Sequence, residues 1–408
     1  MAFGKLTGSV RVGISALLLA LSPLASSVHA APHKPTADSE VLERLPWRAD
    51  DTSSRELAAL RRAMTAAATD PAPAADLAQR YFDLAMARGD PRYVGYAEAV
   101  VAHFGGPLPA SLRSIRGLLR QYRHDFAGAL DDFAGALALD PDWAAAHAWR
   151  AAIYLVQADY AAAQKECDAL HRLGRSTLQG GCAGLLEAYT GRLEAGYRSL
   201  RSALATTSDV DNRLWLLTRL GEVAAWRGDT TRAEAHYREA LGLGRDDGYL
   251  LAAWGDYLLD MGRPAEVITQ LAGWEASDSL LLRLAEAAAM LKRPDAPRLA
   301  QALDERFAAA RLRGDTTHRA EEARYRLRLR GDVAEALRLA RANYGVQREP
   351  RDARILLEAA IAAQDPAAAQ PARDWLRSSG FEDARLRRLG RESCKGASAC
   401  ETALVTRP

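Results

Sequence analysis

Histidines are the residues best suited to acid–base or metal chemistry near neutral pH, and they are few and scattered in this sequence of 408 residues. His147, His236 and His318 fall on segments with helical spacing. None of them stands with another histidine or a carboxylate at a ligand spacing that recurs along the chain. A single imidazole without a partner is rarely functional, so we expect these histidines to be packing or surface residues and expect no metal site.

Common motifs of catalysis and cofactor binding are absent from the sequence. It has no Gly-rich phosphate loop, no zinc-protease helix motif, no nucleophile elbow and no kinase signature. We therefore expect no catalytic residue and no cofactor, and a protein that is not an enzyme. An enzyme whose site is assembled from several unlike polar residues remains an alternative.

One dense basic cluster could bind an anion. Its members are Arg324, Arg326, Arg328 and Arg330. Glu321 and Glu322 precede the cluster by three to four residues, which favours a solvated helix face whose charges they neutralise. The alternative is a surface that binds an acidic polysaccharide or a lipid head group.

Four cysteines form two pairs with different spacing. Cys167 and Cys182 lie at equal distances on either side of a connection at residues 174–180, so they would lie level if this connection joined antiparallel helices. A disulfide closing that loop would stabilise the fold by roughly 3 kcal/mol in the chain-entropy model. Cys394 and Cys400 could close a small ring in the C-terminal segment. A four-cysteine metal site would need C-x-x-C spacing, which is missing.

The N-terminus has the pattern of a secretory signal peptide. Lys5 and Arg11 precede an apolar stretch over residues 12–21, and small residues follow up to Ala30. The stretch is shorter than the about 20 residues of a membrane span. Cleavage after Ala30 would leave equal numbers of basic and acidic residues. This balance argues against a nucleic-acid partner, because phosphate contacts need a distinctly basic surface.

The elements that must carry these residues repeat with a period of about 34 residues. A turn signal recurs in steps of 31 to 38 residues, at Gly89-Asp90, His124-Asp125, Ala158-Asp159, Gly191-Arg192, Gly228-Asp229, Gly262-Arg263, Arg293-Pro294, Gly331-Asp332 and Gln364-Asp365. Helix-length segments rich in Ala, Leu and Arg flank each turn, with apolar residues three and four apart. The first turn residue can end one helix, and the aspartate that often follows can cap the next. The unit is therefore a helical hairpin.

Several positions of this hairpin carry residues of one type. Small residues stand seven before the turn, at Gly117, Ala151, Gly184, Gly221 and Gly255, and five after it, at Ala129, Ala163, Gly196, Ala233 and Ala336. Larger apolar residues stand nine after it, at Phe133, Cys167, Leu200 and Tyr237. With these residues the chain resembles the tetratricopeptide repeat family, best over residues 109–274. The resemblance implies an all-α fold, a right-handed superhelix of about nine hairpins.

The expected layout has four parts. Residues 1–30 form the signal peptide, residues 31–52 a flexible leader, residues 53–390 the repeat domain and residues 391–408 a C-terminal tail. A first helix over residues 53–68 is expected to cover the open end of the repeats.

In the resembled family the first helices line a concave surface on which partners usually lie. The residues at or near these positions are Tyr122, Tyr189, Trp215, Glu222, Trp226, Tyr249, Asp256 and Tyr325. They imply an aromatic groove with an acidic fringe, and aromatic residues are enriched at binding hot spots. We expect an adaptor of the cell envelope that holds another envelope protein or a peptide segment, without membrane insertion. The oligomeric state is left open.

Export is the first testable expectation. Cell fractionation should place the protein outside the cytoplasm, in the periplasm or the medium, with a mature N-terminus near Ala31 by mass spectrometry. A cytosolic protein that keeps Met1 would contradict the localisation.

Overall fold

The computed structural model describes residues 52–394 and Ala37. The compact unit begins at Arg55, and the description below concerns this unit. Residues 1–36, 38–51 and 395–408 lie outside the described residues, so neither the cleavage site nor the Cys394–Cys400 pair is described. No helix in the described part is long and apolar enough to cross a bilayer.

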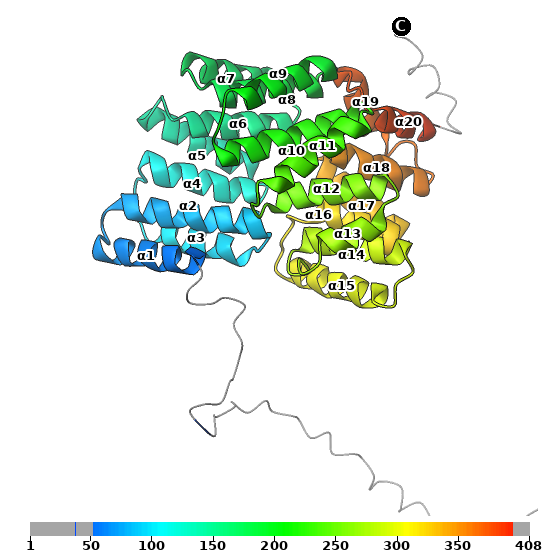
Figure 1. The fold of residues 1–408 in the computed structure, drawn as a ribbon, viewed down its shortest axis with the longest axis horizontal. Coiled ribbons are helices and arrows are strands. Elements are labelled where there is room, and N and C mark those ends of the chain that lie inside the picture. Colours follow the sequence, from blue (N-terminus) through cyan, green and yellow to red (C-terminus); the bar gives the residue numbers. More distant parts are fainter. Residues whose placement is uncertain (1–36, 38–51, 395–408) are drawn as a thin grey trace, which may run out of the picture. The chain divides into compact units, whose positions relative to one another are not determined.

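Over residues 52–394 the chain is all-α, and its helices form nine consecutive hairpins (Figure 1). The first four hairpins are α2 (Pro71–Arg88) with α3 (Arg92–Ala102), α4 (Ala110–Tyr122) with α5 (Phe126–Leu139), α6 (Ala144–Val156) with α7 (Tyr160–Arg172), and α8 (Ser176–Tyr189) with α9 (Leu193–Ala205). The next three are α10 (Val210–Trp226) with α11 (Thr230–Gly242), α12 (Gly248–Asp260) with α13 (Pro264–Gln270), and α14 (Asp278–Met290) with α15 (Ala296–Leu312).

The last two hairpins are less regular. α16 (Arg319–Tyr325) continues as a π-helical segment, η1 (Arg326–Arg330), and pairs with α17 (Val333–Tyr344). α18 (Pro350–Ala362) pairs with α19 (Gln370–Ser379), and α20 (Ala384–Glu392) follows. α20 thus includes the first two residues of the segment expected to be a tail.

The expected turns are confirmed at eight of nine positions. The residues Gly89, His124, Ala158, Gly191, Gly228, Gly262, Gly331 and Gln364 all have φ between +54° and +78°. In the remaining hairpin the left-handed residue is Lys292, with φ +52°, one position before the expected Arg293. Aspartates cap the following helices as expected, for example Asp125 and Asp332, which accept from the backbone N–H groups of Gly128 and Glu335.

Close packing within each hairpin explains the small residues of the repeat. A β-carbon on Gly117 would lie 2.8 Å from the Phe133 ring, and one on Gly221 would lie 2.7 Å from Tyr237. The small residue before the turn therefore accommodates the large residue after it. Phe133 is fully buried and Tyr237 is 2 % exposed, so both positions belong to the core that holds the two helices together.

The N-terminal helix α1 (Thr52–Ala66) packs on α2, as expected for a helix that covers the end of the array. Leu57 is buried in the same apolar cluster as the residues of α2. Arg61 Nε donates to Tyr81 Oη at 2.7 Å, and Arg80 lies 2.7 Å from Glu56.

Later hairpins pack against earlier ones along one edge, which a simple array of neighbours does not require. We call this the turn edge: the side of the first four hairpins where His124, Ala158 and Gly191 form the turns. Arg348 N–H donates to Val156 O at 2.7 Å, and Leu193 N–H donates to Glu382 at 2.8 Å.

Two further contacts close the array. Gly191 passes so near Gly380 that a β-carbon would lie 2.6 Å from the Gly380 carbonyl oxygen. Elsewhere α2 contacts α12, where a β-carbon on Gly248 would lie 3.0 Å from Met86 O. Hairpins far apart in sequence are therefore held against each other.

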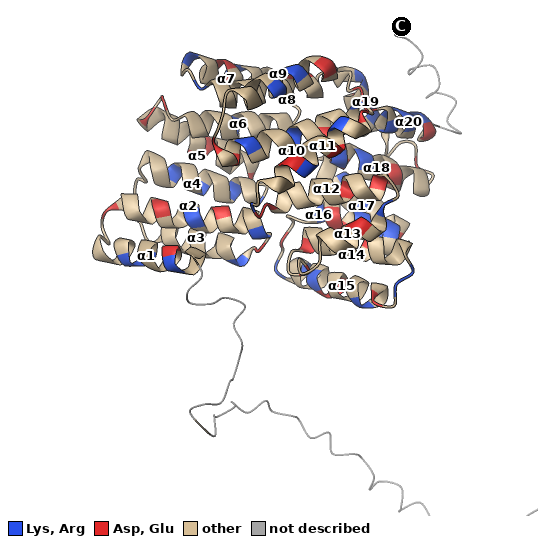
Figure 2. Cartoon of the chain, viewed as in Figure 1, with Lys and Arg blue, Asp and Glu red and all other residues tan. Residues whose placement is uncertain are grey.

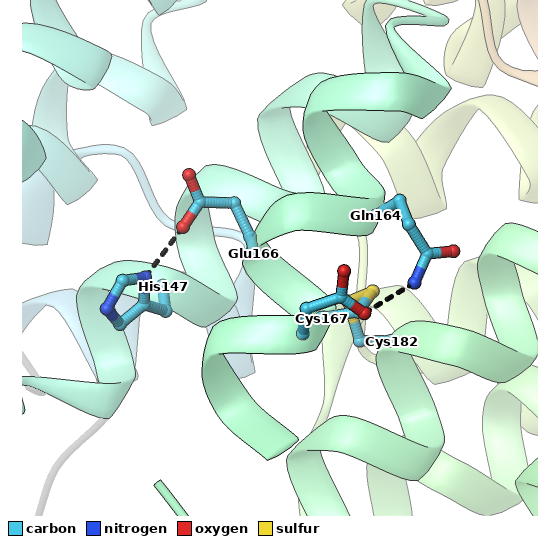
Figure 3. Close-up of a disulfide and its surroundings, with 6 residues drawn as sticks. His147, Gln164, Glu166, Cys167 and Cys182 are labelled. Carbon is cyan, nitrogen blue, oxygen red and sulfur yellow. Dashed lines mark hydrogen bonds and ion pairs between the residues drawn. A yellow bond between two sulfur atoms is a disulfide. The ribbon is translucent and has the colours of Figure 1, made fainter. Parts of the chain in front are cut away.

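Cys167 and Cys182 form a disulfide between α7 and α8, with 5.6 Å between their Cα atoms (Figure 3). The connection they flank is shorter than expected, since α7 ends at Arg172 and α8 begins at Ser176, which leaves Gly180 inside α8. The two helices are still joined by a short turn, so equidistant residues lie level with each other.

Removing this disulfide should destabilise the protein. The double substitution Cys167→Ala/Cys182→Ala is expected to lower the free energy of unfolding by about 2–4 kcal/mol, because the unfolded chain regains loop entropy. Urea denaturation with and without reductant measures this. Reductant should shift the midpoint of the wild type much more than that of the variant; equal shifts would place the effect at other cysteines.

Candidate functional site

A cavity of about 620 Å³ lies between the first helices α8, α10 and α12 and the C-terminal helices α18 and α20. Five of the eight residues expected on the concave surface line it: Tyr189, Glu222, Trp226, Tyr249 and Asp256. Their helices belong to three consecutive hairpins, so the repeat itself brings them together. The far wall comes from α18 and α20, whose residues lie about ninety or more positions later in the chain.

Three of the expected residues lie elsewhere. Tyr325 is fully buried and donates through its hydroxyl to Ala300 O at 2.9 Å, so it belongs to the packing between α15 and α16. Trp215 lies against Gly181 of the preceding hairpin. Tyr122 is half-buried; burial is the main cause that raises its pKa to about 12, with Asp315 contributing.

Aromatic packing forms one end of the cavity. The Phe381 ring lies 5.3 Å from Trp226, 6.2 Å from Tyr189 and 5.3 Å from Trp375, measured between ring centroids. Tyr189 is only 4 % exposed and its hydroxyl donates to Glu349 at 3.4 Å. These aromatic side chains therefore already hold α8 and α10 against the C-terminal helices, and Trp226 keeps part of its surface exposed to the cavity.

Tyr249 and Glu222 form a polar wall beside this packing. The Tyr249 hydroxyl donates to Glu222 at 2.7 Å, and Arg219 donates to the same carboxylate at 2.8 Å. The guanidinium of Arg219 also lies over the Tyr249 ring, with its Cζ 4.3 Å from the centroid. Arg351, on α18, approaches the same ring to 5.5 Å.

The floor of the cavity is part of a chain of ion pairs, which we call the ion-pair chain. It joins α12, α14, α16, η1, α18 and α20 through alternating residues, in the order Arg283, Asp256, Arg324, Glu286, Arg328, Glu358, Arg354, Asp260 and Arg385. The Arg324 guanidinium lies 2.6 Å from both Asp256 and Glu286. The whole sequence of contacts crosses helices that are not neighbours in the array.

Because these charged side chains are buried, each of them needs an oppositely charged neighbour. The side chains of Arg283 and Glu286 are 6 % and 7 % exposed. Burial by itself would raise the pKa of Asp256, but Arg283 and Arg324 outweigh it and hold that pKa well below its usual range. Asp256 is therefore a carboxylate throughout the physiological range.

The four arginines of the cluster at residues 324–330 are all paired with carboxylates of this chain, although Arg328 and Arg330 keep exposed surface. Arg324 and Arg328 belong to the ion-pair chain, while Arg326 and Arg330 each lie 3.3 Å from Asp304 of α15. Of the two glutamates expected to neutralise the cluster, Glu322 contacts Arg326 at 3.3 Å, but most partners come from other helices. Besides Glu322, the carboxylate partners of the four arginines come from α12, α14, α15 and α18.

His147 contacts a carboxylate of the neighbouring helix within its hairpin. Its Nδ1 lies 2.6 Å from Glu166, which also contacts Arg150 at 2.8 Å, next to the disulfide (Figure 3). Since Glu166 and His147 lie on the two helices of one hairpin, this contact braces α6 against α7. His236, on α11, contacts the hydroxyl of Tyr197, on α9, at 2.8 Å and so joins two consecutive hairpins. Within residues 52–394 no group of three or more His, Cys, Asp or Glu side chains is arranged to hold a metal.

The far wall of the cavity was not foreseen from the sequence. Glu349 lies 160 residues after its partner Tyr189, and Arg354 lies 94 residues after its partner Asp260. They carry no repeat signature, and their contacts depend on how the array closes. Acidic and basic residues are interspersed over the helices rather than gathered by sign (Figure 2), so charge patterning gave no signal either.

The ion-pair chain predicts a large effect of one substitution. Asp256→Asn should lower the free energy of unfolding by about 3 kcal/mol, because it leaves Arg283 buried without its carboxylate. Since the folded-state pKa of Asp256 is depressed, its contribution is present above the unfolded pKa of about 3.9 and is lost as pH falls below it. Denaturation curves at pH 7 and pH 3 should therefore differ less for the variant.

A matched surface pair provides the control. Glu275 and Arg298 form an ion pair with side chains 46 % and 58 % exposed, so Glu275→Gln should cost less than about 1 kcal/mol. Equal effects of the two substitutions would show that the ion-pair chain does not hold the helices together.

Comparisons with known proteins give similarities of fold. No family model matches the sequence, and no curated protein matches it. Among solved structures, a tetratricopeptide repeat protein from Parabacteroides merdae has 15 % identity and a TM-score of 0.37, covering 62 % of this chain and 91 % of its own. The TPR domain of P58(IPK) has 15 % identity and a TM-score of 0.22, covering 80 % and 94 %.

A third structure, of Naa15/Naa10 bound to HypK-THB, has 14 % identity and a TM-score of 0.26, covering 83 % of this chain and 63 % of the other. None of the three superimposes closely enough to transfer a function. The period, the left-handed turns, the capping aspartates and the small-to-large packing within each hairpin together show a solenoid of tetratricopeptide-like hairpins.

Proposed function

We propose that this protein is a non-enzymatic scaffold of the cell envelope that holds a short polypeptide segment of another envelope protein in the cavity between α8–α12 and α18–α20. The observation that carries the proposal is the cavity itself, because five residues expected on the binding face of the repeats line it. Its volume of about 620 Å³ falls in the range of about 300–1,000 Å³ typical of ligand pockets. It has room for a few side chains of a partner.

The lining favours a polypeptide. Aromatic residues and arginines are the types most enriched at protein-binding hot spots, and here Trp226, Tyr249 and Arg351 stand together. Acidic groups such as Glu222 and Glu194 lie beside them. Glu222 and Glu194 are already paired with Arg219 and Arg227, so the aromatic part of the lining favours a segment with an apolar side chain.

The alternative partner, an acidic polysaccharide bound by the cluster at residues 324–330, has less support. Each of its four arginines already contacts a carboxylate of this chain. A polyanion would have to displace these carboxylates from partly buried positions. An enzyme with a composite site, the remaining alternative, has no supporting observation within residues 52–394.

The test uses a substitution that places a large side chain in the cavity and removes no existing interaction. Truncating Trp226 would disturb its packing on Phe381, so Ala253, which lines the cavity on α12, is the better position. Ala253→Trp should weaken capture of the partner from envelope extract at least about tenfold, as loss of a hot-spot contact does. Its melting temperature should stay close to that of the wild type.

Ala134→Trp, at an exposed position of α5, is the matched control and should bind as the wild type does. A photo-crosslinking residue at Met261, which lines the cavity and is 41 % exposed, should label the partner. If a folded Ala253→Trp protein captures the partner as well as the wild type does, the cavity is not the binding site. Capture of a glycan instead, falling steeply with salt, would favour the polysaccharide.

A further inference from the structure

A second cavity, of about 910 Å³, lies where the turn between α6 and α7 meets α17, α18 and α19. Its lining shares no residue with the cavity discussed above. Apolar surface comes from Leu356, Pro371 and the ring of Trp375. The cavity exists only because the C-terminal hairpins pack against the turn edge.

The charges of this second cavity are not balanced. Arg341, Arg348 and Arg377 line it together with a single carboxylate, Asp374. Arg377 lies 3.1 Å from Asp374, and both side chains are about half exposed. Arg341 and Arg348 are exposed at the mouth of the cavity, and their guanidinium groups contact no carboxylate among the described residues. In the first cavity, by contrast, arginines such as Arg351 and Arg354 are paired with acids.

An unpaired hydroxyl group lies at the same cavity. Tyr344 lines the cavity and is 4 % exposed, and its hydroxyl is buried without a hydrogen-bond partner in the part of the chain that is described. Buried hydroxyl groups are normally paired, because leaving one unpaired costs its full desolvation. Burial is the main cause that raises the pKa of the Tyr344 hydroxyl, and the positive charge of Arg348 opposes this shift. The hydroxyl therefore stays protonated and can donate a hydrogen bond.

A neighbouring hydroxyl has the same capacity. Tyr160 accepts a hydrogen bond from Trp375 Nε1 at 2.7 Å. Its own proton has no acceptor among the described residues. The wall therefore offers uncompensated positive charge and the Tyr160 hydroxyl beside apolar surface, and the Tyr344 hydroxyl is a further donor that a ligand reaches when neighbouring side chains move.

We propose that this second cavity binds a small dianion, a phosphate monoester or a dicarboxylate, whose oxygens contact Arg341 and Arg348 and accept from the hydroxyl of Tyr344. Two unpaired guanidinium groups match two negative charges, and oxyanions are the ligands that guanidinium groups bind with most specificity. The volume, about 910 Å³, suits a small molecule. This site is independent of the polypeptide site proposed above.

The experiment uses the full mature protein with inorganic phosphate and with succinate as probes, in separate titrations at constant ionic strength. Calorimetry gives the affinity, and the melting temperature gives the linked stabilisation. Binding of phosphate alone would assign phosphate monoesters, and binding of succinate alone would assign dicarboxylates. Failure of both to bind would overturn the proposal.

Two sets of variants make the result specific. Arg341→Gln/Arg348→Gln should abolish binding, whereas Arg172→Gln/Arg201→Gln, which removes two exposed charges elsewhere, should leave it unchanged. Tyr344→Phe should weaken binding at least about tenfold, since it removes a hydrogen bond to a charged group. The same substitution should raise the melting temperature of the ligand-free protein, because an unpaired buried hydroxyl is removed.

Equal affinities for the two double variants would show that the anion binds non-specifically and would overturn the site. So would a Tyr344→Phe protein that is less stable without ligand and binds as the wild type does. Ala253→Trp should bind the anion normally, which separates this outcome from failure of the polypeptide proposal.

Discussion

The ion-pair chain from Arg283 to Arg385 is the interaction on which the arrangement of the C-terminal half depends. Its members come from six helical segments, and its central charges are largely removed from solvent. Buried charges are tolerated only when each one is paired. The positions of α12, α14, α16 and α18 are thus mutually constrained, because moving one of them would leave a buried guanidinium or carboxylate without its partner. Both cavities lie next to helices that this chain holds.

The ion pairs and the apolar packing stabilise different parts of the fold. Within each hairpin, small residues such as Gly117 and Gly221 let the two helices approach closely, and the apolar core supplies most of the stability. Between distant hairpins the contacts are polar or aromatic, as with Tyr160 and Trp375. Polar contacts are directional. They therefore determine which surfaces pack together more than they supply the free energy of that packing.

Local features of the fold could be predicted from the sequence. The turns follow from the recurrence of Gly or a substitute before Asp, and the left-handed residues confirm them at eight of nine positions. Lys292 differs because its turn has neither a glycine nor a following aspartate, and the nearby Pro294 suggested a later position. The disulfide between Cys167 and Cys182 also followed, since it depends on a single hairpin-to-hairpin connection.

The return of the chain onto the turn edge could not be predicted. Contacts such as Tyr189 with Glu349 join residues 160 positions apart, and no periodicity links them. The sequence placed Tyr189, Glu222, Trp226, Tyr249 and Asp256 near one another because they lie on the first helices of three consecutive hairpins, but it gave no indication of the opposite wall. Tyr325 shows the limit of this reasoning, since the π-helical segment that follows it belongs to an irregular hairpin in which the side chain faces α15.

Closure by the C-terminal helices has a kinetic consequence. A polypeptide emerges from its N-terminus, and domains or repeats can fold as they appear. The hairpins from α2 to α11 depend mostly on local contacts and can form early. Phe381, which packs on Tyr189 and Trp226, is synthesised more than 150 residues later than either of them. During that interval Phe381 does not yet cover the rings of Tyr189 and Trp226. The nascent protein therefore exposes an aromatic surface, able to associate with other chains, that the finished protein keeps mostly buried.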